Sequence, residues 1–216
     1  MSAYASSPLK QKHLELEERI RHPNGNWQPL DWRRVESSIP ARIAELARTA
    51  PGRLAIYGPS TSLTYAALDQ AANRVAQAIL AERGPGSEAV ALLLGVGVPA
   101  ITAALGVLMA GKFYTALEPS FPRARSSQIL ADAEAHLILT DEHHLALARE
   151  LAGSQRRVHQ IERLAEGGAL PAPDLAIEPD APAILNYTSG STGLPKGVLQ
   201  SHTSALAHSL RWTDYY

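Results

Sequence analysis

The stretch AVALLLGVGVPAITAALGVLMAG, residues 89–111, contains no charged residue and gives the first indication of the fold class. By length alone it could cross a membrane as one helix. Gly95, Gly97 and Pro99 interrupt it at its centre, which is typical of two shorter elements. We therefore predict a buried strand over 89–94, a tight turn, and a buried helix with Pro99 in its first turn. No membrane partner is expected.

The same alternation of strand and helix continues on both sides. Thr64 is an N-cap candidate, and Gly84 ends the long apolar-periodic segment that follows it. Strands separated by helices pair in parallel, with both faces of the sheet covered. The predicted fold class is thus α/β, a largely parallel sheet covered by helices. Strands are expected near 53–57, 113–117, 136–139, 157–161, 183–187 and 197–200, and the remaining helices near 39–50, 122–135 and 142–152. Residues 166–182 are expected to be a surface connection.

Composition limits the function further. The 216 residues are 45% hydrophobic with a net charge of -1, which is typical of a soluble globular chain and leaves no basic patch for nucleic acid. The absence of cysteine excludes disulfides and thiolate metal sites, and residues 1–20 lack the apolar segment of a signal peptide. We expect a cytoplasmic protein with a polar leader over 1–38, partly helical or disordered, before an α/β unit over 39–216.

The segment YTSGSTGLPKG, residues 187–197, is the candidate functional site. Its glycines allow successive backbone N–H groups to converge on one point, as in an anion-binding nest. Its hydroxyls add hydrogen-bond donors, and its lysine adds a mobile positive charge. The pattern therefore indicates a loop that binds phosphates and lies between two strands at the carboxyl edge of the sheet. The residues concerned are Thr188, Ser189, Gly190, Ser191, Thr192, Gly193, Lys196 and Gly197.

A Walker P-loop is the nearest rival for this segment. That motif requires glycine before the lysine and a hydroxyl after it, and it opens a helix. Here Pro195 precedes Lys196, Gly197 follows, and a strand comes next. A P-loop NTPase is therefore rejected. A solvated Gly/Ser linker is the plain alternative, but it would not need a lysine behind a proline.

YTSGSTGLPKGV resembles the phosphate-binding motif of the acyl-adenylate-forming (AMP-binding) superfamily, which includes acyl-CoA synthetases and nonribosomal peptide synthetase adenylation domains. Residues 63–80 resemble the first core motif of this superfamily, and residues 107–141 resemble the second, in a form similar to amino-acid adenylation domains. Two residues depart from that form: Lys112 lies beside Gly111, and Glu118 replaces the usual aspartate. The fold implied is the N-terminal portion of an adenylate-forming enzyme.

The resemblance implies an ATP-dependent ligase. A carboxylate attacks the α-phosphorus of ATP, pyrophosphate leaves, and the acyl-adenylate passes to a phosphopantetheine or CoA thiol. The hydroxyls and glycines of residues 188–193 would hold the β- and γ-phosphates, and Lys196, the catalytic candidate, would stabilise the departing pyrophosphate. The implied partners are ATP with magnesium, a carboxylic acid such as an amino acid, and a carrier protein or the later part of the enzyme.

The later motifs of the superfamily have no counterpart in these 216 residues. They would supply the magnesium ligands and the carboxylate pocket. We expect an incomplete adenylation domain, from a truncated, split or decayed gene product, that shows no appreciable acid-dependent pyrophosphate exchange on its own. A non-catalytic, adenylation-like interaction module stays open as an alternative.

Two other patterns carry alternative interpretations. Residues 95–100 match the dinucleotide pattern G-x-G-x-x-[GA], with Glu118 placed where a ribose-binding acid could lie, so a Rossmann protein is a further alternative. The histidines lack the spacing of a helical metal site, because His143 and His144 are adjacent and His202 and His208 are six apart. No metal site is predicted, and His202 is interpreted as a polar helix-start residue rather than a group that lines the substrate site.

Overall fold

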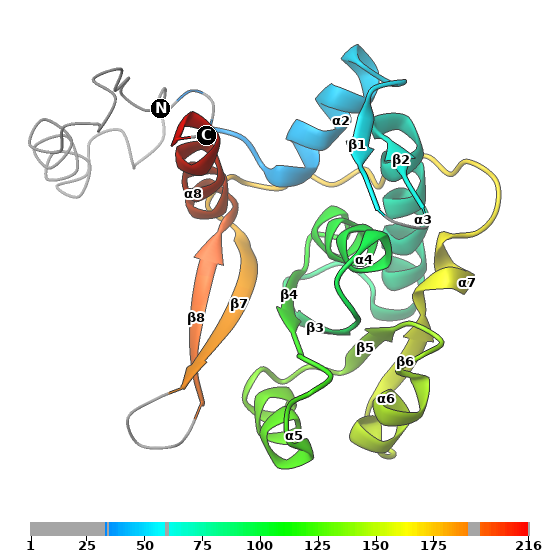
Figure 1. Ribbon diagram of the computed structural model, residues 1–216, viewed down its shortest axis with the longest axis vertical. Coiled ribbons are helices and arrows are strands. Elements are labelled where there is room, and N and C mark those ends of the chain that lie inside the picture. The colour runs from blue at the N-terminus through cyan, green and yellow to red at the C-terminus, as the bar shows by residue number, and fades with distance from the viewer. Residues whose placement is uncertain (1–32, 34, 59–60, 190–194, 216) are drawn as a thin grey trace, which may run out of the picture.

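A six-stranded mixed sheet forms the centre of the computed structural model, which describes residues 33, 35–58, 61–189 and 195–215 (Figure 1). The strand order is β6-β5-β3-β4-β7-β8, and every neighbouring pair is parallel except β7 and β8. The predicted largely parallel α/β fold is confirmed. The strands are β3 (Ala89–Leu93), β4 (Phe113–Ala116), β5 (Leu137–Thr140), β6 (Arg157–Gln160), β7 (Pro182–Ser189) and β8 (Pro195–Ser201).

Helices cover both faces of this sheet. Helices α3 and α4 pack on one face, and α5 and α6 pack on the other (Figure 1). The elements outside the strands are α2 (Ile39–Thr49), α3 (Tyr65–Arg83), α4 (Val98–Met109), α5 (Arg123–Asp132), α6 (Leu145–Ala152), α7 (Ile161–Ala165) and α8 (His202–Tyr215). The C-terminal helix α8 therefore lies beyond the antiparallel hairpin of β7 and β8.

Residues 89–111 form a strand, a turn and a helix, as predicted. All five residues of β3 are buried, and α4 begins at Val98 with proline in its first turn. Gly97 has a φ of 151°, a conformation that L side chains rarely adopt, so the turn depends on glycine there. In the part of the chain that the structure describes, no helix has the length and apolar character needed to cross a membrane.

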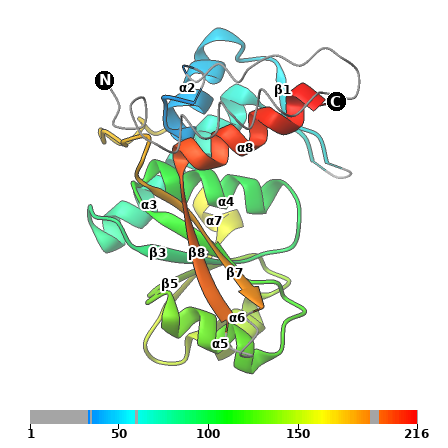
Figure 2. The same ribbon diagram turned by 90° about the vertical axis from the view of Figure 1, so that its left-hand side faces the viewer.

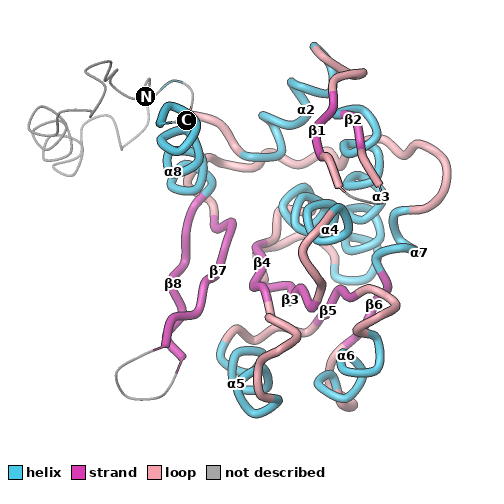
Figure 3. The backbone as a smooth tube through the Cα atoms, in the orientation of Figure 1, coloured by secondary structure: helices cyan, strands magenta, loops and turns pink. Residues whose placement is uncertain are grey.

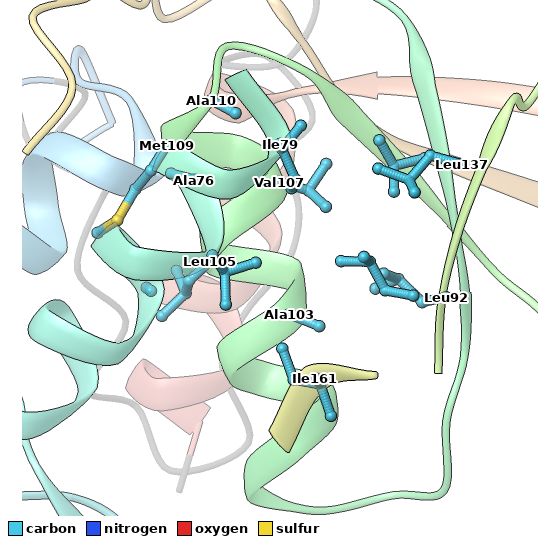
Figure 4. Packing of buried hydrophobic residues seen from close by; sticks show 14 of the residues in the cluster. Ala76, Ile79, Leu92, Ala103, Leu105, Val107, Met109, Ala110, Leu137 and Ile161 are labelled. Carbon is cyan, nitrogen blue, oxygen red and sulfur yellow. The ribbon is translucent and has the colours of Figure 1, made fainter. Parts of the chain in front are cut away.

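Strand β3 contributes side chains to two separate hydrophobic clusters because its residues alternate between the two faces. Val90 and Leu92 join the cluster under α3 and α4, while Ala91 and Leu93 join the cluster under α5 and α6. Figure 4 shows the first cluster, where Leu92 and Leu137 of the sheet face Ala103 and Val107 of α4. One central strand thus links both halves of the core.

The ends of α3 follow the predicted chemistry. The Thr64 hydroxyl accepts a hydrogen bond from the Ala67 N–H at 3.3 Å, and Gly84, the C-cap, has a φ of 64°. Two features were not predicted (Figure 3). Strand β1 (Leu54–Ile56) pairs antiparallel with β2 (Leu63–Thr64) in a separate two-stranded ribbon, and β6 continues into the short helix α7. Strand β1 agrees with the strand predicted near 53–57, whereas β2 and α7 are too short for periodicity to reveal them.

The predicted division at residue 38 stays a prediction, because residues 1–32 and 34 lie outside the described part of the chain. Ser38 is the N-cap of α2, with its hydroxyl 3.3 Å from the Ala41 N–H.

Candidate functional site

The hairpin of β7 and β8 carries the candidate site. Strand β7 runs parallel to β4, so its carboxyl end points to the same edge of the sheet as the ends of β3, β4 and β5. Strand β8 then returns antiparallel beside it and leads into α8 (Figure 2). Both segments that flank the predicted loop are therefore strands, and the end of β7 and the start of β8 lie at the carboxyl edge, where open α/β sheets bind ligands.

The register of the hairpin places two predicted site residues opposite each other. Thr188 pairs with Lys196, Tyr187 with Gly197, and Ser189 with Pro195. Directly opposed residues of an antiparallel pair project from the same face. The exposed side chains of Thr188 and Lys196 consequently share one face of the hairpin. Gly190, Ser191, Thr192 and Gly193 lie outside the described residues.

The opposite face of the hairpin packs toward α5. The Tyr187 hydroxyl donates a hydrogen bond to Oδ2 of Asp132 at 2.7 Å. Burial of the phenol, together with the neighbouring carboxylate, raises the pKa of Tyr187 well above its ordinary value of 10.0. Tyr187 therefore stays protonated and acts as a donor. Neither Tyr187 nor Asp132 was predicted to have a role, because no local pattern signals a contact between them.

His202 is the first residue of α8 and lies where the hairpin ends. The prediction that it begins a helix is confirmed, but the side chain is only 1% exposed and so is not a surface polar group. Its Nδ1 accepts a hydrogen bond from the Ile39 N–H at 3.3 Å, and burial lowers the pKa of His202 to about 4. His202 thus joins the end of β8 to the start of α2.

The glycine turn after β3 is already occupied by a carboxylate of the chain. The Gly95 N–H donates to Oδ2 of Asp141 at 3.4 Å, and the backbone N–H of His144 donates to Oδ1 at 2.8 Å. Burial opposes ionisation, but these hydrogen bonds and the His144 ring hold the pKa of Asp141 below its ordinary value. An ionised carboxylate beside the Gly95 amide disfavours a pyrophosphate at this turn, and with it the dinucleotide alternative.

Lys112, one of the two departures noted in the sequence, has a structural position. It is 1% exposed, and its Nζ lies 2.8 Å from Glu88 and donates to the carbonyls of Gly84 and Gly86 at 3.1 Å each. Hydrogen bonding from Arg83, together with that from Lys112, lowers the pKa of Glu88 to about 2 despite partial burial. This lysine joins the end of α3 to the start of β4 and lies away from the candidate site.

The described residues do not gather the side chains that a metal ion needs. No group of three or more His, Asp or Glu side chains among them could hold such an ion. His143 and His144 make an edge-to-face ring contact with centroids 4.8 Å apart, and Nδ1 of His144 lies 2.7 Å from Asp141.

Comparison with known sequences identifies the class of protein. The family described as "AMP-binding enzyme" matches residues 43–215, so the chain belongs to this family. It is 40% identical over 203 residues to nonribosomal peptide synthetase sidE of Aspergillus fumigatus, covering 92% of this chain and 9% of that protein. It is 34% identical over 178 residues to a linear gramicidin synthase protein of Brevibacillus parabrevis, covering 82% of this chain and 2% of that protein.

The similarity to phosphinothricin tripeptide synthetase PhsC of Streptomyces viridochromogenes is 38% identity over 165 residues, covering 74% of this chain and 15% of that protein. The chain thus spans between 2% and 15% of the length of these three relatives. Within the family, it resembles the adenylation domains of nonribosomal peptide synthetases, as predicted.

Solved structures agree with this assignment. The nonribosomal peptide synthetase FmoA3, in a form bound to α-methyl-L-serine-AMP, matches with a TM-score of 0.72 and 25% identity, over 81% of this chain and 19% of that chain. A Mycobacterium tuberculosis fatty acyl CoA synthetase matches with a TM-score of 0.69 and 22% identity, over 76% of this chain and 34% of that chain. The second match supports the fold alone. Adenylate-forming enzymes share the arrangement of strands and helices seen here.

Proposed function

We propose that this chain carries the phosphate-binding loop of an ATP-dependent ligase that activates a carboxylic acid as an acyl-adenylate. The observation that supports it most is the pairing of Thr188 with Lys196 at the open end of the hairpin, where both side chains are exposed on one face. A hydroxyl donor and a cation on the same face suit the β- and γ-phosphates of ATP, which Ser189, Gly190, Ser191, Thr192, Gly193 and Gly197 would also contact.

In the proposed reaction, a carboxylate oxygen bonds to the α-phosphorus, and the bond from that phosphorus to the bridging oxygen breaks. Negative charge then accumulates on the departing pyrophosphate. Lys196 would act electrostatically on this charge rather than as a nucleophile or proton carrier. Magnesium bound with ATP would supply further charge neutralisation.

The family and the relatives support a class of substrate and acceptor. An amino acid is the first candidate for the acid, because sidE and PhsC, two of the relatives named above, are peptide synthetases. A phosphopantetheine thiol on a carrier protein is then the first candidate acceptor, with CoA as the alternative. Attack of the thiolate on the acyl carbon would form a thioester and release AMP.

Isothermal titration of the purified chain with magnesium pyrophosphate and magnesium ATP at low salt tests the proposal. Lys196→Ala should weaken both affinities about tenfold, because it removes a charge-assisted donor. Arg163→Ala is the matched control, since it removes an exposed cation from α7. Helix α7 follows β6, which is the edge strand on the side of the sheet opposite to β8. Equal affinities in the wild type and Lys196→Ala would contradict the proposal.

The absence of acid-dependent exchange by residues 1–216 alone stays a prediction. Measuring the incorporation of labelled pyrophosphate into ATP with a panel of amino, aryl and fatty acids tests it directly. Exchange clearly above that of Lys196→Ala with any of these acids would show that the chain turns over unaided.

A further inference from the structure

The loop end of the β7–β8 hairpin has little support from the sheet itself. The ladder pairing between β4 and β7 is the single pair Tyr114 and Ile184. From Leu185 onward, β8 is the ladder partner of β7, and most of the hairpin side chains there are exposed. A contact from a neighbouring helix can therefore add to the support that holds Thr188 and Lys196 in position.

Tyr187 supplies such a contact. Its hydroxyl donates to Asp132, the last residue of α5, at 2.7 Å. Figure 1 shows α5 beside the end of the hairpin that carries the connection, and Figure 2 agrees from the second direction. Because neighbouring residues of a strand project to opposite faces, the anchor at Tyr187 lies one residue from Thr188 but leaves the Thr188 face open.

The ring of Tyr187 also contacts the other strand of the hairpin. A Cβ atom at Gly197 would lie 3.5 Å from Cε1 and from Cζ of Tyr187, and 3.1 Å from Cδ1 of Leu185. The ring thus lies against the backbone of β8 at the residue that follows Lys196. Gly197, predicted as a phosphate-contacting residue, has this second role of leaving room for the ring.

We propose that Tyr187 and Asp132 are positioning residues for Thr188 and Lys196, a role that rests on the function proposed above. Their hydrogen bond holds the end of the hairpin against α5, and the ring carries this constraint across to β8. Thr188 and Lys196 are thereby kept in the geometry that phosphates require. Without the bond, the binding-competent arrangement would be a smaller fraction of the population, and the apparent affinity would fall by that fraction.

The test uses titration with magnesium pyrophosphate on the full chain. Tyr187→Phe and Asp132→Ala should each weaken binding about three- to tenfold, and the double variant no further, since both remove one hydrogen bond. Asp132→Asn keeps an acceptor oxygen and should retain most of the affinity. Tyr57→Phe is the matched control, because the Tyr57 side chain is 83% exposed.

A second measurement separates positioning from a general loss of stability. Hydrogen exchange of residues 185–199 in the free protein should accelerate in Tyr187→Phe, while exchange of α4 stays unchanged. In a Lys196→Ala background, Tyr187→Phe should have a smaller further effect on binding than in the wild type, because one of the two groups that it positions is gone.

The outcomes distinguish the two proposals. If Lys196→Ala weakens binding but Tyr187→Phe and Asp132→Ala do not, the positioning role is overturned and the proposed function stands. If Lys196→Ala binds as well as the wild type, the proposed function fails and the positioning role falls with it. Additive losses in the Tyr187→Phe and Asp132→Ala double variant would also overturn the positioning role.

Discussion

The buried side chain of His202 should make the stability of the protein depend on pH. The buried ring accepts the Ile39 N–H through Nδ1, and its pKa is lowered to about 4. In the unfolded chain the ordinary value is 6.5, so between pH 6.5 and 4 the unfolded state binds a proton that the folded state does not. We therefore expect the free energy of unfolding to fall as the pH falls through this window, by about 3 kcal/mol at most.

Urea unfolding at pH 7 and pH 5 measures this effect in the wild type and in His202→Asn, which keeps an acceptor near the Nδ1 position. The wild type should lose more stability between the two values than the variant. His136→Gln, which removes an exposed histidine, should behave as the wild type does. The same pH dependence in wild type and His202→Asn would contradict the assignment.

For single residues, the sequence indicates the chemical properties of a site better than it indicates which side chains contact each other. The hydroxyls, glycines and lysine of residues 188–197 indicate a phosphate site because each residue type has a defined property. The contacts of Tyr187 with Asp132 and of His202 with Ile39 join residues 55 and 163 positions apart. No local spacing encodes such contacts. Lys112 was likewise noted only as a departure from a motif, and its buried partners required the fold.

Among the elements, the contact of α3 with α4 depends on a residue without a side chain. A Cβ atom at Gly106 would lie 2.5 Å from both Cβ and Cγ1 of Val75, and 3.1 Å from the Ala72 carbonyl oxygen. Gly106→Ala should lower the free energy of unfolding by about 1–3 kcal/mol, because the clash outweighs the better helix propensity of alanine. Chemical denaturation followed by far-UV circular dichroism measures the change.

The control for this prediction is the double variant Val75→Ala with Gly106→Ala, which removes the clash with Cγ1 of Val75 but keeps the contact with its Cβ atom. Its destabilisation should be smaller than the sum of the two single changes. Two outcomes would show that α3 and α4 are less tightly packed than described. One is a destabilisation of the double variant equal to the sum of the two single changes, and the other is a Gly106→Ala protein as stable as the wild type.

Element boundaries were predictable where end signals were present. Thr64 and Gly84 bound α3 by the capping chemistry expected of them, and the glycine turn separates β3 from α4. Strand β1 was predicted, but β2, which pairs with it, and the helix α7 were missed because segments of two and five residues show no periodicity. The antiparallel direction of β8 follows from its pairing with β7 along the whole hairpin. The amino-acid composition of the two strands does not reveal this direction.

Strand β3 contributes side chains to both hydrophobic clusters of the molecule. Leu92 belongs to the cluster under α3 and α4, and Leu93 belongs to the cluster under α5 and α6, with 5% and 0% of their surfaces exposed. Truncating either side chain leaves a cavity on one face only. If the shared sheet couples the two clusters, each truncation should lower the stability of the packing on both faces.

Leu92→Ala and Leu93→Ala should each lower the free energy of unfolding by about 2–5 kcal/mol. Hydrogen exchange gives the decisive measurement, because the slowest amides report global opening when unfolding is cooperative. We expect the slowest amides of α4 and of α5 to lose the same protection in either variant. Ile101→Ala, at a side chain that is 42% exposed on α4, should change little. Protection lost only in α4 for Leu92→Ala, and only in α5 for Leu93→Ala, would mean that the two halves of the core unfold independently despite the shared strand.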